Sequence, residues 1–274
     1  MKKKVLAAIL VGMMTVSLAA CGSSSDGAAA STGSATKAAE DVTGTMKGET
    51  ITVGTSGLFG PFSYYDTDGT TLIGYDIDLL TDIQGILGFE IDGGIQAMDY
   101  SALTTSITEG KLDVGAAALC ATDERKKVMD FSQTYCDSGQ MVMVNKDNDE
   151  GITGVDDLAG KTVAVEKGTA SHIYAQKNLT DATIEVHDTI TTAYESLEQK
   201  KVDAVIQDGP GCAFYIKTTD QTALETVGDE FNQGQAPYAI AYNKDFKYQD
   251  EFNAALKMLK EDGTLDELYT KWCE

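Results

Sequence analysis

Three residues stand where the sequence could build a binding site for a small zwitterion: Arg125, Thr169 and Asp208. Arg125 is the only arginine in a chain of 274 residues, and the other 20 of the 21 Lys and Arg residues are lysines. Its planar guanidinium can give a carboxylate two parallel hydrogen bonds, which a lysine ammonium cannot match. Thr169 opens a predicted helix after a glycine turn, and free N–H groups at a helix start favour an anion. Asp208 ends a predicted strand, where its carboxylate could hold an ammonium group.

Each of the three residues also has an ordinary structural interpretation. Arg125 lies in a run of charged residues and would then be an exposed surface group. Thr169, or Ser171 beside it, would cap the helix that follows. Asp208 precedes a Gly-Pro-Gly sequence and would cap the next helix. Taken one at a time, the motifs leave these alternatives open.

Strand and helix signals alternate along the chain from residue 51. Apolar and β-branched runs predict strands at 51–56, 89–97, 111–119, 161–168, 183–186, 202–208 and 236–244. Helical periodicity predicts helices at 75–87, 101–108, 169–177, 191–200, 212–217, 250–262 and 265–272.

This alternation predicts parallel sheets covered by helices, arranged as two lobes of about 90 residues each. Ligands of such folds bind in a crevice at the carboxyl ends of the strands. Functional residues are therefore expected just after the strands, at 56–62, 118–125, 168–171 and 207–209.

The N-terminus has the layout of an export signal. Residues 1–20 comprise three lysines, an apolar run and small residues, and they are predicted to be a lipoprotein signal peptide. The order Leu-Ala-Ala-Cys resembles a lipobox, which makes Cys21 the expected lipidation site; an ordinary signal peptide is the alternative. Residues 21–49 are rich in Ser, Gly, Ala and Thr and predict a lipidated flexible tether. We expect an exported protein, anchored by lipid to the cell membrane and facing outside the cytoplasm.

Composition excludes several classes of function. The net charge of −22 argues against binding to nucleic acid or to anionic lipid. No cluster of histidine, cysteine and carboxylate residues indicates a metal, and no cofactor is expected. Four cysteines lie beyond Cys21, and two disulfide pairings stay open, Cys120 with Cys136 and Cys212 with Cys273.

Several stretches together resemble the bacterial ABC-transporter extracellular solute-binding proteins of the polar amino-acid-binding family. They are GPFSYYDTDGTTLIGYDIDLL, MDYSALTTSITEGKLDVGAAALCATDERKKVMDFSQTY, LAGKTVAVEKGTAS, KKVDAVIQD and LKEDGTLDELYTKW. The resemblance implies a two-lobed periplasmic-binding-protein-like α/β fold. Lobe 1 would comprise residues 50–140 plus 240–274 and lobe 2 residues 143–236. Two hinge-crossing strands would lie near the sequences MVMV and YAIAY.

The resemblance also implies a role for most of the candidate residues. Arg125 would hold the ligand carboxylate, with help from the helix start at Thr169 and Ala170. Asp208 would hold the ammonium group. Phe59 and Tyr100 would sandwich the ligand side chain, although core packing is the plainer interpretation of both.

Four further site residues depart from the family pattern or vary within it. Cys120 stands where a hydroxyl residue is usual, and a thiol is a weak donor. Ala118 stands where Gly or Ser is common. Ser56 stands where acidic residues often meet polar or basic ligand side chains. Glu166 would repel acidic ligands, which favours a neutral polar or basic amino acid.

The predicted function is a lipid-anchored, monomeric receptor that captures an amino acid and delivers it to an ABC permease. It requires no catalytic residue. Two alternatives remain at this point: a module that senses the ligand without transport, and a dehydratase-like enzyme on the same fold.

Overall fold

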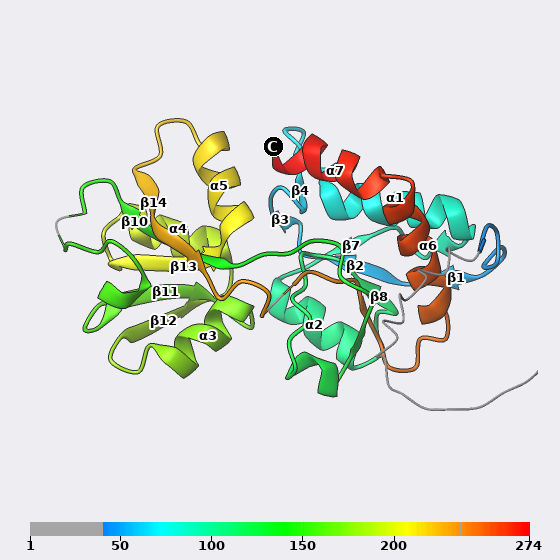
Figure 1. Cartoon of the computed structure of the whole chain (residues 1–274), viewed down its shortest axis with the longest axis horizontal. Coiled ribbons are helices and arrows are strands. Elements are labelled where there is room, and N and C mark those ends of the chain that lie inside the picture. Colours follow the sequence, from blue (N-terminus) through cyan, green and yellow to red (C-terminus); the bar gives the residue numbers. More distant parts are fainter. Residues whose placement is uncertain (1–40, 149, 236) are drawn as a thin grey trace, which may run out of the picture. The chain divides into compact units, whose positions relative to one another are not determined.

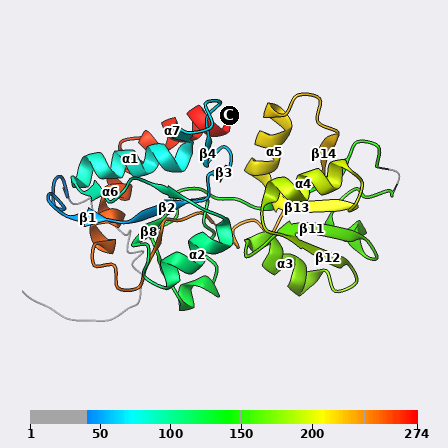
Figure 2. The same ribbon diagram turned by 180° about the vertical axis from the view of Figure 1, so that it is seen from behind.

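The structure, a computed structural model, describes residues 41–274 except residues 149 and 236. Within these residues two five-stranded sheets, each with helices on both faces, define two lobes (Figures 1 and 2). The predicted signal peptide, Cys21 and most of the predicted tether lie outside the described residues. None of the described helices is both long and apolar enough to cross a bilayer.

Lobe 1 is built on the sheet with strand order β7-β2-β8-β15-β9. The strands are Gln96–Ala97, Val53–Thr55, Val114–Gly115, Ala241–Tyr242 and Asp130–Phe131. Helices α1, α6 and α7 contribute to the core on one face and α2 to the core on the other. These helices are Tyr75–Leu87, Gln249–Glu261, Thr264–Cys273 and Tyr100–Thr108.

Lobe 2 is built on the sheet with strand order β12-β11-β13-β10-β14. The strands are Thr183–His187, Thr162–Glu166, Ala204–Asp208, Gln140–Asn145 and Leu224–Phe231. Alternation along β13 explains the two cores, because Ala204 and Ile206 face one core and Val205 the other. Helix α3 covers the first face, and α4 and α5 cover the second; they are Ala170–Asn178, Ile190–Glu198 and Gly209–Thr218.

Smaller elements complete the described chain. Strands β1 and β6 form a two-stranded parallel pair, Thr50–Ile51 and Glu90–Ile91. Strands β3, β4 and β5 form a three-stranded antiparallel sheet, Leu58–Phe59, Ser63–Tyr65 and Leu72–Ile73. Two 3₁₀ helices, η1 and η2, span Arg125–Lys127 and Val155–Leu158.

The chain crosses between the lobes twice, at residues 132–139 and 232–240. The two crossings pair with each other, since Tyr238 N donates to Cys136 O at 2.8 Å and Tyr135 N donates to Tyr238 O at 3.0 Å. The MVMV sequence lies within β10 of lobe 2, and YAIAY runs from the second crossing into β15 of lobe 1. The crossings therefore lie beside the expected sequences, each a few residues closer to the N-terminus.

The predicted helices all occur, with ends that differ by at most three residues from the prediction, but the sheets differ from expectation in three ways. Both sheets are mixed, because β10 runs antiparallel to β13 and β14, and β15 runs antiparallel to β8 and β9. Strand β14 was not predicted, because its sequence has only a weak alternation of apolar and polar residues. The strands expected at 111–119 and 236–244 are present as strands of only two residues each, β8 and β15. All four described cysteines are free thiols, so neither open disulfide pairing is formed.

Residues 42–46 belong to the folded lobe 1, although the sequence predicted residues 21–49 as a flexible tether. Val42 and Met46 are buried in the core of lobe 1. Gly44 N donates to Ile86 O at 2.7 Å, and Met46 N donates to Leu87 O at 2.9 Å, so this turn satisfies carbonyls at the end of α1.

An aromatic contact joins the lobes beside β3. Phe59 of lobe 1 lies so close to Gly211 in α5 that a Cβ there would be 2.3 Å from Phe59 Cε2. On the other side Phe214 of α5 packs against Gly60, and its ring centroid lies 4.9 Å from that of Tyr64. Two glycines, one from each lobe, thus make room for a ring from the other lobe.

We expect Gly211→Ala to lower the free energy of unfolding by about 1–3 kcal/mol, because the methyl group overpacks against Phe59. Gly85→Ala is the matched control: Gly85 is an exposed residue of α1 with no atom within 4 Å of the added Cβ. Helix propensity alone should make that change stabilising by about 0.5–1 kcal/mol. Urea unfolding measures both, and effects of the same sign would contradict the packing argument.

Candidate ligand-binding site between the lobes

Arg125 is buried and bridges the two lobes. Its Nη1 donates to the carbonyl of Cys120 at 2.8 Å, within lobe 1, and its Nη2 donates to the carbonyl of Gly168 at 2.7 Å, in lobe 2. The guanidinium carbon lies 5.2 Å from the centroid of the Tyr100 ring, in range of a cation–π interaction. With only 7% of its surface exposed, Arg125 is not the solvated surface group of the alternative interpretation.

Asp208 ends β13 and is surrounded by neutral donors. Its Oδ1 accepts from Gln140 Nε2 at 3.1 Å and from the Ser171 hydroxyl at 3.4 Å, and its Oδ2 accepts from the Tyr238 hydroxyl at 3.0 Å. The side chain does not cap α5. Burial raises the pKa of Asp208, while the hydrogen bonds from Gln140 and Tyr238 oppose that rise.

The start of α3 uses the Thr169 side chain for local structure. The Thr169 hydroxyl accepts from His172 N at 3.1 Å and donates to Glu166 O at 2.8 Å, which makes Thr169 the N-cap. The capping interpretation therefore describes this hydroxyl. Ala170 begins the helix and is buried.

The loop after β8 is held by a buried carboxylate that sequence reasoning missed. Ala118 has a positive φ of 48°, and its N–H donates to Asp76 Oδ2 at 2.7 Å. The other oxygen of Asp76 accepts from the Tyr135 hydroxyl at 2.6 Å, so one side chain ties α1 to this loop and to the first crossing. Cys120, two residues on, makes two weak sulfur contacts: its Sγ lies 3.8 Å from Asp208 Oδ2 and 3.9 Å from the Ala118 carbonyl oxygen.

Of the remaining predicted residues, Phe59 and Tyr100 lie at the contact between the lobes, whereas Ser56 does not. The Phe59 ring stacks on the Phe62 ring, with centroids 5.7 Å apart, and packs against Gly211 of lobe 2. The Tyr100 ring lies against the guanidinium of Arg125. Ser56 is buried, but its hydroxyl lies 3.2 Å from that of Ser63, so it is engaged within lobe 1.

Glu166 ends β11 with its carboxyl group buried. Burial is the main cause that raises its pKa, to about 8; the charges of Asp208 and Asp99 add to the rise, and a hydrogen bond from Ile190 N–H opposes it. The site thus combines one buried cation, Arg125, with several buried carboxylates.

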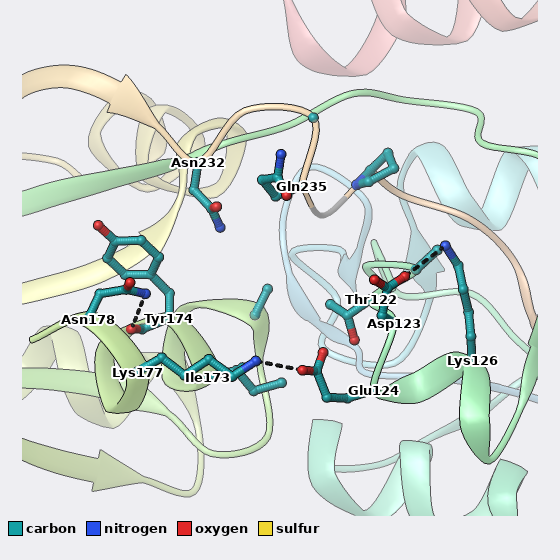
Figure 3. A pocket seen from close by; sticks show the side chains of 14 residues that line it. Thr122, Asp123, Glu124, Lys126, Ile173, Tyr174, Lys177, Asn178, Asn232 and Gln235 are labelled. Carbon is teal, nitrogen blue, oxygen red and sulfur yellow. Dashed lines mark hydrogen bonds and ion pairs between the residues drawn. The ribbon is translucent and has the colours of Figure 1, made fainter.

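A groove of about 410 Å³ lies where lobe 1, α3 and the second crossing approach one another (Figure 3). Lys177 of α3 and Glu124 of lobe 1 form an ion pair across it. Of the predicted site residues only Ala170 lines this groove. Among the described residues no group of three or more potential ligands could hold a metal ion.

Sequence reasoning also missed Gln140, Ser171 and Tyr238 around Asp208. Ser171 lies in the predicted strand-end segment 168–171, so that rule could have found it. Gln140 and Tyr238 belong to or border the two crossings, and only the pairing of the crossings with each other brings them to Asp208.

Comparison with known proteins gives a consistent picture. A family model described as bacterial extracellular solute-binding proteins, family 3, matches residues 51–274. The arginine-binding extracellular protein ArtP of Bacillus subtilis is 29% identical over 272 residues, covering 98% of each chain. The structure of an ancestral arginine-binding protein bound to glutamine is 36% identical with a TM-score of 0.75, covering 81% of this chain and 97% of that one. The ancestral amino acid-binding protein AncCDT-1, a precursor of cyclohexadienyl dehydratase, is 32% identical with a TM-score of 0.73, covering 82% and 96%.

Asp76→Asn should change how stability depends on pH. Burial raises the pKa of Asp76 to about 6, above its usual value near 4, so the folded protein binds this proton more tightly than the unfolded chain does. The stability that the protonated carboxyl contributes is present below pH 4 and is lost as the pH rises through 6.

Between pH 4 and 7 we therefore expect the wild type to lose on the order of 3 kcal/mol of unfolding free energy relative to Asp76→Asn. Chemical unfolding at several pH values measures this, with the exposed Asp92→Asn as the control that should run parallel to the wild type. Parallel curves for all three proteins would show that Asp76 titrates alike in the folded and unfolded states.

Proposed function

The chain belongs to family 3 of the bacterial extracellular solute-binding proteins, and we propose that it captures a neutral polar or basic amino acid for an ABC importer. Its two-lobed fold is that of the periplasmic amino-acid-binding proteins it resembles. The family and the relatives named above are extracellular binding proteins, which implies an exported protein with an amino-acid ligand in an ABC transport context.

One observation supports the proposed binding mode: two buried groups of opposite charge type lie where the lobes meet, one on each lobe. Arg125 belongs to lobe 1, and both of its hydrogen-bond partners are neutral carbonyl oxygens. Asp208 belongs to lobe 2, and its oxygens accept from neutral donors. An α-amino acid carries the two complementary charges in a fixed arrangement, so it would pair with both groups at once.

The other residues take supporting roles in this proposal. Phe59 and Tyr100 would pack on the ligand side chain, and the helix start at Thr169 and Ala170 would face the carboxylate through backbone groups, since the Thr169 hydroxyl is used as a cap. Cys120 lies near Asp208 but offers only a thiol, so it would contribute little to holding the ligand. Ser56 and Ala118 would line the site from lobe 1.

Charge in the site supports the ligand class. Glu166 and Asp208 are both buried carboxylates, and Arg125 is the buried cation beside them. A side-chain carboxylate on an acidic ligand would lie near these acidic groups, with Arg125 already paired to the ligand α-carboxylate, whereas an amide or a cation would be accepted. The similarity to an arginine-binding protein, and to a structure bound to glutamine, supports the same two classes.

The remaining parts of the proposal concern location and partners. Acylation of Cys21, which lies outside the described residues, would anchor the exported protein to the cell membrane, and a monomer with closed lobes would dock on the permease. A sensing module and an enzyme are not favoured. The matched relatives are binding proteins, and AncCDT-1 is itself amino-acid-binding although it precedes a dehydratase.

We expect Arg125→Lys and Asp208→Asn each to weaken amino-acid binding at least tenfold, because a hydrogen bond to a charged group contributes roughly 1.5–3 kcal/mol. Lys127→Gln is the control: it removes an exposed charge from the same 3₁₀ helix and should bind within about twofold of the wild type.

The measurement is a thermal-shift screen against the common L-amino acids at 1 mM, followed by calorimetric titration, after bound ligand is removed by partial unfolding and dialysis. A micromolar ligand at this excess should add roughly 4 kcal/mol of stability. No shift with any amino acid would refute the proposed ligand class. Binding that survives both clamp substitutions would refute the binding mode alone.

A further inference from the structure

A histidine holds the turn that presents the Gly168 carbonyl to lobe 1. His172 lies in the first turn of α3, and its Nδ1 accepts a hydrogen bond from the N–H of Gly168, with 3.0 Å between the two nitrogens. The carbonyl of the same glycine accepts from Nη2 of Arg125 at 2.7 Å. Gly168 has a φ of 80°, so the conformation of this turn lies in the left-handed region. One glycine therefore links the His172 ring to the contact that Arg125 makes between the lobes.

This hydrogen bond determines which nitrogen of His172 carries the proton. A backbone N–H can only donate, so Nδ1 must offer its lone pair, and the proton of the neutral ring must lie on Nε2. Nε2 is buried and has no hydrogen-bond partner among the residues that the structure describes. An imidazolium would thus bury one N–H without an acceptor and point a second N–H at that of Gly168. Burial lowers the pKa of His172, in agreement with this geometry.

Neighbouring charges do not compensate an imidazolium at this position. Burial alone accounts for the lowered pKa of His172. The first turn of α3 is also the positive end of the helix dipole, where a cation is unfavourable. The charged and titratable groups of the turn, of α3 and of the elements beside them have other partners: Lys167 with Asp188, Lys177 with Glu124, Arg125 with two carbonyls, Glu166 with the Ile190 N–H, Asp208 with Gln140 and Tyr238, and His187 with Glu185.

The proposed binding mode gives this turn a direct part in holding the ligand. Arg125 would pair with the ligand carboxylate, and backbone groups at the start of α3 would face it. We propose that His172 is a positioning residue whose protonation weakens amino-acid binding: the neutral ring holds the Gly168 turn in place for Arg125 and the ligand, and the imidazolium releases it. The inference rests on the proposed function, because it takes capture of an amino acid at this turn as given.

The helix itself does not depend on the ring. The Thr169 cap accepts from the backbone N–H of His172, which protonation of the side chain leaves unchanged. A change in binding at low pH would therefore report on the Gly168 turn and not on loss of α3.

Two substitutions separate the acceptor from the ring. Asparagine places its Oδ1 where histidine places Nδ1, so His172→Asn keeps an acceptor that does not titrate. His172→Phe keeps a ring and removes the acceptor. Because a neutral hydrogen bond is worth a factor of this order, we expect the wild type to lose about threefold to tenfold in affinity relative to His172→Asn as the pH falls from 7.5 to 5. His172→Phe should bind more weakly than the wild type by a similar factor at pH 7.5.

The experiment is calorimetric titration of the purified, ligand-stripped protein with L-glutamine and L-arginine, whose side chains keep their charge from pH 5 to pH 7.5. The ratio of wild-type to His172→Asn affinity at each pH removes the contributions of Asp76, Glu166 and Asp208, which both proteins share and whose pKa values burial also raises. His187→Gln is the control: it replaces the other histidine of the chain and should follow the wild type.

Linkage provides a second measurement that needs only the wild type. If protonation of His172 weakens binding, then a bound amino acid must lower the pKa of His172 by the logarithm of the same factor, about 0.5–1. The chain has two histidines, so an NMR titration can follow both rings with and without saturating probe, and His187→Gln assigns the signals.

The outcomes distinguish the two levels of the proposal. An affinity ratio that does not change with pH, a His172 pKa that is the same with and without bound amino acid, or a His172→Phe variant that binds like the wild type at pH 7.5 would each overturn the role of His172 and leave amino-acid capture intact. Failure of both probes to bind at any pH would overturn the proposed function, on which the inference rests. The NMR titration decides the matter even where a substituted chain fails to fold.

Discussion

The hydrogen bonds of Arg125 are the contact on which the arrangement of the site depends. One guanidinium joins the loop after β8, through the Cys120 carbonyl, to the turn after β11, through the Gly168 carbonyl. These are the carboxyl-terminal connections of parallel strands in two different sheets, so a single side chain fixes the distance between the edges that face each other. The planar guanidinium also lies against the Tyr100 ring, so contacts within the protein set its orientation.

The same region buries carboxyl groups, which costs free energy that a core built only for stability would avoid. Asp76, Glu166 and Asp208 are buried carboxyl groups, and burial is the leading cause that raises the pKa of each. Neutral donors offset part of the cost at Asp208, where Gln140 and Tyr238 hold the carboxylate without cancelling its charge. Charges that are oriented but not neutralised are what a zwitterionic ligand requires, since it supplies the missing counter-charges itself.

The rule that ligands bind after the carboxyl ends of strands was enough to single out Arg125 and Asp208 from the sequence, and it could have singled out Ser171, because strand ends are local features. The alternation of strands and helices likewise gave the helices of both lobes. What could not be predicted depends on pairing between distant segments. Gln140 and Tyr238 reach Asp208 only because the two crossings pair, and β14 is a strand because β10 offers it an edge, not because of its own apolar pattern.

Local signals also leave the role of a residue open. Thr169 was expected both as a cap and as a ligand contact, and its hydroxyl is used as the cap. Asp76 occupies the first turn of α1, where an acid is ordinary because it complements the helix dipole, so nothing in the sequence marked it out. Its role depends on the loop after β8, which brings the buried N–H of Ala118 to its carboxyl group.

In the proposed function, the placement of the two charges on different lobes ties selection of the ligand to closure of the lobes. A molecule with a single charge could pair with Arg125 or with Asp208, but only a molecule with both charges could engage both lobes. Binding energy that depends on both lobes favours the closed arrangement by the difference in affinity between the two states. In the proposed function, therefore, the lobe contact made by Arg125 and the recognition of an amino acid are parts of one equilibrium, and the aromatic contact of Phe59 with Gly211 contributes to the same closed state.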